Sequence, residues 1–103
     1  MRASSYPFEK FFNAISGMAT SERPLRDRIV GAHTSFVAVN EKDFKDPDAK
    51  REYQELMRRL TKVQHPEKGS VWASLQAMSD DEVEKTADLI VSILHHLILA
   101  GDT

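Results

Sequence analysis

Apolar residues recur at intervals of three and four through most of this chain, and that spacing limits the possible folds more than any other feature. The interval matches the turn of an α-helix, about 3.6 residues, so each run predicts a helix with one apolar face. No pair of the Asn-Gly or Asp-Gly type lies between alternating β-branched runs, so there is no signal for a β-hairpin. We therefore expect an all-α fold.

Start and stop signals divide the chain into five expected helices. Pro7, Pro24 and Pro47 each fit the first turn of a helix, where a missing N–H group costs no hydrogen bond. Ser79 and Glu82 have the spacing of a capping box, and Gly101 fits a C-terminal stop. The expected helices cover about 6–19, 22–39, 47–63, 71–78 and 80–100. We predict a single helical domain over 1–103, a small antiparallel bundle of four main helices plus one short helix.

The composition excludes several classes of protein. The chain has no Cys, so disulfides, thiolate nucleophiles and Cys-containing zinc sites are ruled out, which is typical of a reducing cytoplasm. Its 14 Lys and Arg against 16 Asp and Glu argue against a protein whose main task is to neutralise phosphates. The N-terminus lacks the apolar run of a signal peptide, and the apolar stretch 89–100 is too short to span a bilayer. We expect a cytoplasmic protein without membrane contact.

No catalytic or metal-binding motif is recognisable in the sequence. His95 and His96 are adjacent, so on a helix they point about 100° apart and do not chelate one metal as a pair. Asp88 and Ser92 share a face with these imidazoles, yet no residue is nominated as a third ligand. His33 fits a core or boundary position. Because nucleophile turns, phosphate loops and paired carboxylates are also missing, we expect no enzyme activity, no cofactor and no metal.

Two ends of the chain carry more apolar residues than one helix face holds. The first helix has three Phe within five positions, and the stretch 89–100 is apolar on most sides. Surplus apolar surface of this kind is buried either in the core of the same chain or at a subunit interface. We favour self-association as a homodimer, with a plain monomeric core as the alternative. The predicted self-association surface comprises Phe8, Phe11, Phe12, Leu94, Leu97 and Ile98.

The expected helix over 47–63 is the most cationic part of the chain. Arg51, Arg58, Arg59 and Lys62 form a predicted basic surface, which suits phosphates or an acidic partner. The alternative is an ordinary solvated face, because acids three or four residues away pair with these bases. A helix-turn-helix would need a shorter turn than the polar segment 40–45. Nucleic acid is therefore the second choice of partner, after another protein.

The aromatic and charged residues near the last two helices offer further candidates. Trp72 is either a core residue or an anchor for a partner protein. Six acidic residues and one Lys lie in 79–103, whereas 1–78 carry thirteen basic and ten acidic residues. The acidic start of the last helix thus complements the basic helix, within one chain or between two chains.

Three short segments carry a resemblance to known proteins. They read PLRDRI at 24–29, GSVWASLQAMSDDE at 69–82 and LIVSIL at 89–94, and they are similar to small helical proteins of bacterial operons. Ala73, Ser74, Met78 and the last segment also resemble a helix in the small dimeric antiactivators that sequester quorum-sensing transcription factors. The chain departs from that second group at Ser79, where the capping box interrupts one long helix. The resemblance implies a bacterial cytoplasmic accessory protein.

Together these observations predict a non-enzymatic small helical protein, a protein-protein interaction or regulatory accessory protein that acts as a homodimer and presents a surface to another protein. The alternative is a small nucleic-acid-binding regulator that uses the basic helix. Leu94→Asp is expected to disrupt folding or assembly, because it places an unpaired carboxylate on an apolar stripe.

Overall fold

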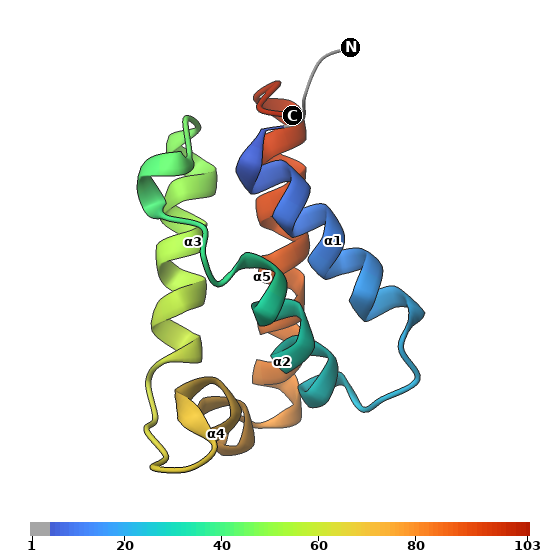
Figure 1. Cartoon of the computed structure of the whole chain (residues 1–103), viewed down its shortest axis with the longest axis vertical. Coiled ribbons are helices and arrows are strands. Elements are labelled where there is room, and N and C mark those ends of the chain that lie inside the picture. The colour runs from blue at the N-terminus through green and yellow to red at the C-terminus, as the bar shows by residue number, and fades with distance from the viewer. Residues whose placement is uncertain (1–4) are drawn as a thin grey trace.

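Every regular element over residues 5–103, the part of the chain that the computed structural model describes, is a helix (Figure 1). The elements are α1 (Tyr6–Thr20), α2 (Leu25–Phe36), the 3₁₀ helix η1 (Glu41–Asp43), α3 (Pro47–Leu60), α4 (Gly69–Ala77) and α5 (Asp80–Leu99). The expected all-α class, with five α-helices, is confirmed.

The capping signals form as the sequence predicts. Ser79 Oγ accepts a bond from the N–H of Glu82 (3.2 Å), and the Glu82 carboxylate accepts one from the N–H of Ser79 (3.3 Å). Asp46 caps α3 by accepting a bond from the backbone N–H three residues later. Gly101 has a φ of 71°, and the N–H of Asp102 reaches back to the α5 carbonyl five residues earlier. That pair of features is a Schellman stop for α5.

The second helix is shorter at its start than the expected range 22–39. It begins at Leu25, and Pro24 takes the N-cap position without a side-chain bond. Because a proline disfavours helical geometry in the residue before it, Arg23 stays outside the helix. The hydroxyl of Ser21 instead accepts a bond from the Arg23 N–H (3.2 Å) in a local turn.

The same helix also stops earlier than expected, at Phe36. The hydroxyl of Tyr53, on α3, donates to the carbonyl of Val39 at 2.6 Å and lies 3.3 Å from the carbonyl of Phe36. The last carbonyls of a helix lack partners within the helix, and the Tyr53 hydroxyl supplies a hydrogen-bond donor from another element. Val39 is buried although it lies outside the helix.

The third, fourth and fifth helices also differ from the expected 47–63, 71–78 and 80–100 at their ends. α3 ends at Leu60, because both backbone groups of Val63 bond the hydroxyl of Ser74 on α4. α4 begins two residues early, where the ring of His65 accepts bonds from the N–H groups of Glu67 and Lys68. The last helix ends one residue early, at Leu99.

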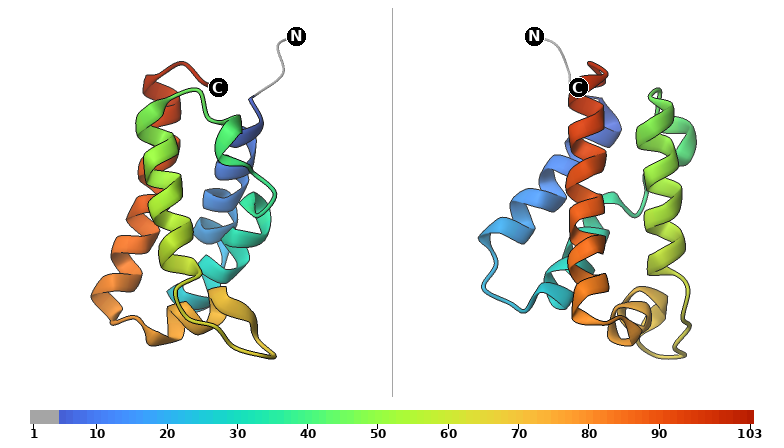
Figure 2. Two further views of the ribbon diagram at one scale, coloured as in Figure 1. Left: turned by 90° about the vertical axis from the view of Figure 1, so that its left-hand side faces the viewer. Right: turned by 180° about the vertical axis from the view of Figure 1, so that it is seen from behind.

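The helices enclose one core. α1 packs mainly on α2, and α3 packs on α5, which runs in the opposite direction beside it (Figure 2). α4 lies across the lower end of the α3–α5 pair (Figure 1). Four aromatic rings meet inside the molecule, where Phe11 stacks on Phe36 with centroids 4.7 Å apart and contacts Phe44 and Tyr53 edge-on.

Candidate functional site

Two members of the predicted self-association surface lie in the core. Phe11 and Leu97 have no exposed surface, so the structure corrects their assignment to an interface. On the last helix Val83, Ile90, Ile93 and Leu97 are buried, whereas Leu94 is partly buried and Ile98 is exposed. Because the stretch 89–100 is apolar on most sides, packing against the other helices selects which side of it faces the core.

The other four members remain at or near the surface. Phe12 is 55% exposed and Ile98 is 53% exposed, while Phe8 and Leu94 are partly buried against the core. The rings of Phe8 and Phe12 are neighbours, with centroids 6.1 Å apart. Val91, which is 50% exposed, is not among the residues predicted for this surface.

These side chains lie along one edge of α5 and on α1, which packs against that helix. On the opposite edge of α5, Ser92 and His96 contact the Glu52 carboxylate of α3. At about 100° per residue, Val91 and Ile98 lie roughly 100–160° around α5 from Ser92 and His96, so they point away from α3. We call Phe8, Phe12, Val91, Leu94 and Ile98 the α1–α5 apolar edge.

The contact of Glu52 with α5 is a polar cluster that the sequence did not reveal. Its carboxylate accepts a hydrogen bond from Ser92 Oγ (2.6 Å) and contacts His96 Nδ1. The serine donates to the acid rather than to the imidazole, so the arrangement of a catalytic triad is absent from these three residues. The cluster ties α3 to α5.

The predicted basic surface splits into two parts. Arg51 lies near the start of α3 and pairs with Asp48 at 2.5 Å. Arg58 and Arg59 lie near its end, where both guanidinium groups bond the Glu55 carboxylate at 2.6 to 2.9 Å. The hydrogen bonds from these two arginines hold the pKa of Glu55 at about 2, so it stays ionised at neutral pH.

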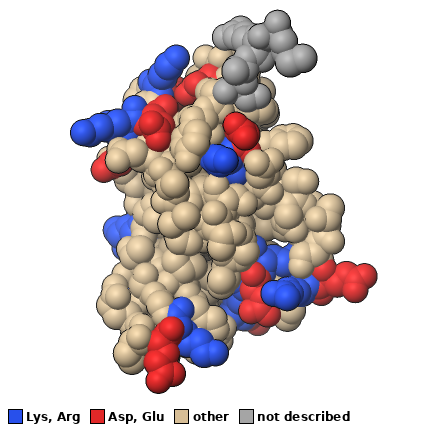
Figure 3. Space-filling model, viewed as in Figure 1, with Lys and Arg blue, Asp and Glu red and all other residues tan. Residues whose placement is uncertain are grey.

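Arg58, Arg59 and Lys62 line a groove of about 280 Å³ between the end of α3, the end of α4 and the start of α5. Lys85 of α5 also lines it, a residue that no sequence signal connects with α3 because the contact is between distant segments. Val63, Ala77 and Met78 supply apolar lining. On the face shown in Figure 3, charged side chains gather toward the margins and the centre is mostly uncharged. We call the groove lined by Arg58, Arg59, Lys62 and Lys85 the basic groove.

The predicted partner anchor, Trp72, is partly buried against its own loop. The His65 ring meets it edge-on, with centroids 5.4 Å apart, and Lys68 Nζ lies 5.5 Å above it. Two residues of the preceding loop therefore cover part of the indole. His33 of α2 is also partly buried, edge-on to Phe36, and burial lowers the pKa of its imidazole below 6.5.

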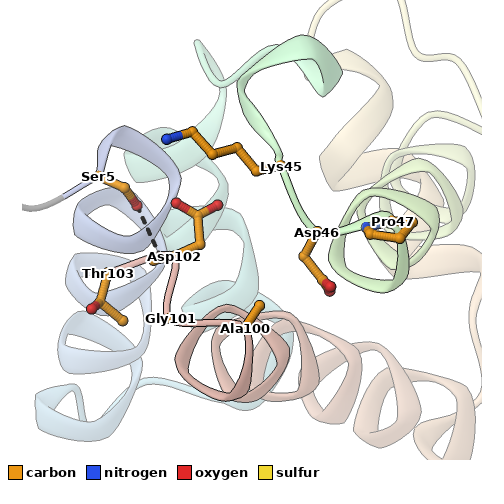
Figure 4. Close-up of a pocket in the computed structure, with 8 residues that line it drawn as sticks. All are labelled: Ser5, Lys45, Asp46, Pro47, Ala100, Gly101, Asp102 and Thr103. Carbon is orange, nitrogen blue, oxygen red and sulfur yellow. Dashed lines mark hydrogen bonds between the residues drawn. The ribbon is translucent and has the colours of Figure 1, made fainter.

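A cavity of about 540 Å³ lies where the two ends of the described chain meet the start of α3 (Figure 4). Ser5 joins these ends by donating to the carbonyls of Asp102 and Thr103. Asp102 is only 8% exposed, and its Oδ2 finds no hydrogen-bond partner within residues 5–103. Lys45 and Asp46 line the same cavity, so its lining carries charges of both signs.

At the acidic start of α5, Asp80 pairs with α2. Arg26 Nη1 bonds Asp80 (2.9 Å), and its other nitrogens bond the carbonyls of Leu75 and Met78. Within residues 5–103, no ion pair joins the acids of this segment to α3. Arg26 therefore fastens α2 to the α4–α5 junction, a role without a local sequence signal.

Comparisons with protein-family models, with curated proteins and with solved structures found no match, so functional assignment depends on the geometry above. The likeness to operon proteins and antiactivators stays a prediction. Within residues 5–103, no helix is both long enough and apolar enough to cross a membrane. The same residues contain no group of three or more His, Asp or Glu arranged to hold a metal ion.

Proposed function

We propose that this chain is a non-enzymatic, cytoplasmic interaction protein that forms a homodimer through the α1–α5 apolar edge and presents its outer surface to another protein. The observation that carries the proposal is the exposure of Phe12, Val91 and Ile98, each at least 50%, on two helices packed together. Exposed apolar surface of this kind marks interaction sites.

The spacing along α5 supports a second copy as the occupant of this edge. Ala87, Val91, Leu94 and Ile98 follow intervals of four, three and four, which is the seam spacing of paired helices. In an antiparallel pair of α5 helices, Val91 would lie opposite Leu94 of the other copy. The large Ile98 would lie opposite the small Ala87, so the seam complements itself, as a two-fold interface requires.

Charge along the border of this seam favours the same pairing. Asp88 and His95 both lie on the exposed side of α5 next to the seam. An antiparallel arrangement brings the acid of one copy near the imidazole of the other, at both ends of the interface. Within each subunit, we propose the antiparallel bundle expected from the sequence, supported by the opposed directions of α3 and α5 (Figure 2).

Light scattering after size exclusion, over a dilution series, tests the dimer. We expect a mass near twice 11.7 kDa for the wild-type chain and a monomer mass for Ile98→Glu. Val37→Glu is the matched control, because Val37 is 54% exposed, is the C-cap residue of α2 and does not belong to the α1–α5 apolar edge. A wild-type monomer at every concentration, or equal masses for the two variants, would contradict the proposal.

Nucleic acid remains the second candidate partner, and the arrangement of the basic residues weakens it. Arg51 and Arg59 belong to separate clusters, and acids three or four residues away pair with both. Proteins usually contact a phosphate backbone with a continuous basic face, rather than with two clusters whose bases are already paired with acids.

A further inference from the structure

The basic groove presents more positive than negative charge to a ligand. Arg58, Arg59, Lys62 and Lys85 line it, and Glu82 is the one acid among the lining residues. The Glu82 carboxylate is engaged at the N-cap of α5, where it accepts bonds from Ser79. Its charge is thus directed at the helix start, which leaves the positive groups dominant in the groove.

Ionic contacts around the groove leave some of its cationic groups unused. Glu55 bonds only the Nε of Arg59, so both terminal nitrogens of that guanidinium have no partner within residues 5–103. Over the same residues, Lys62 forms no ion pair, whereas Lys85 pairs with Asp81 at 3.0 Å. Arg59 is about two-thirds buried, with a side chain 33% exposed, so a bond to it is only partly screened by water.

Glu55 also fixes the position of these donors. One carboxylate holds Arg58 and Arg59 together, and its pKa of about 2 shows how strongly the two cations favour its ionised form. Side chains restrained before binding lose less conformational entropy when a ligand arrives. The unused nitrogens are thereby held ready for an anionic group.

The rest of the groove suits an apolar group of limited size. Val63, Ala77 and Met78 line it beside the partly buried end of α3. Its volume of about 280 Å³ is near the lower limit of ligand pockets, and at ~30 Å³ per water-sized group it holds about nine such groups. A folded macromolecular segment would not enter a space of that size.

We propose that the basic groove binds a small organic anion, with its carboxylate on Arg59 and Lys62 and a short apolar tail against Ala77 and Met78. Octanoate, an eight-carbon carboxylate, matches both the charge and the volume and serves as the probe. This binding site is independent of the α1–α5 apolar edge, so the failure of one proposal leaves the other standing.

The first experiment measures backbone amide shifts of the ¹⁵N-labelled wild-type chain during titration with sodium octanoate. We expect saturable shifts at Ser74, Ala77 and Met78 below about 10 mM ligand. Octylammonium, with the same tail and the opposite charge, should leave these amides unchanged, and acetate should bind at least about tenfold more weakly. Because this comparison needs no variant, it does not depend on how a substitution affects folding.

A pair of variants then locates the carboxylate. Arg59→Gln removes the proposed partner and should weaken octanoate binding about tenfold or more, the value of a charge-assisted hydrogen bond. Arg51→Gln removes the same charge from the same helix at a position outside the groove and should bind like wild type.

Three outcomes would overturn the proposal. The first is the absence of saturable shifts at the three amides, and the second is equal binding of octanoate and octylammonium. The third is equal weakening by the Arg59 and Arg51 variants. If a short DNA duplex shifts these amides and octanoate does not, the groove serves a phosphate backbone instead.

Discussion

Tyr53→Phe removes one oxygen from the centre of the molecule and leaves the aromatic ring in place. Tyr53 is 4% exposed, and its hydroxyl donates to the carbonyl of Val39 at 2.6 Å. The variant leaves that buried carbonyl without a partner, which costs about 1–3 kcal/mol of unfolding free energy at neutral pH. For a domain of this size, each kcal/mol lowers the melting temperature by about 4–8 °C.

The same hydroxyl predicts how the effect changes with pH. Burial, together with the carboxylates of Asp43 and Glu41, raises the pKa of Tyr53 to about 12, from an ordinary value of 10. The folded state therefore favours the neutral phenol, and this contribution is full below pH 10 and lost as the pH rises from 10 to 12. By pH 11, the loss from the wild type is about 1.4 kcal/mol.

Urea unfolding of both chains, at about pH 8 and about pH 11, measures the two effects separately. Other groups that titrate in this range are present in both chains, so the difference between the chains isolates Tyr53. We expect the stability advantage of the wild type to shrink by about 1.4 kcal/mol between the two pH values. An unchanged difference, or equal stability at about pH 8, would refute the assignment of this hydrogen bond.

Three further changes test separate parts of the structure. Ser79→Ala should lower the unfolding free energy by about 1 kcal/mol in urea, through loss of the α5 cap, and no change would contradict its role. The NMR titration of His33 should have a midpoint below pH 6.5. The neutral imidazole then stabilises the fold fully above pH 6.5, and this stabilisation is lost as the pH falls through the midpoint. Leu94→Asp should lower the melting temperature and abolish the dimer, because Leu94 packs partly against the core and belongs to the α1–α5 apolar edge. Unchanged melting with unchanged mass would contradict this placement of Leu94.

Local signals made most of the fold predictable. Asp46, Ser79 and Gly101 act on backbone groups within a few residues, so the helix ends that they determine are readable from the sequence. Two of the helix ends that were wrong, the C-terminal ends of α2 and α3, depend on distant partners. Tyr53 bonds carbonyls at the end of α2, and Ser74 bonds the backbone of Val63. The spacing of residues within one helix does not show that these partners lie close together.

The sites divide in the same way. Apolar spacing indicated surplus surface on the first and last helices, but only packing separates the buried Phe11 and Leu97 from the exposed Phe12 and Ile98. The cationic end of α3 was visible in the sequence, whereas the groove also needs Lys85 and the apolar end of α4.

The sequence by itself determined the all-helical class, the number of helices and most of their caps, because these depend on interactions between near neighbours in the chain. Only the tertiary structure decided which apolar residues face the core and which basic residues share a groove. An α-helix that is apolar on several sides permits more than one rotation about its axis, and the rotation is selected by contacts between distant segments.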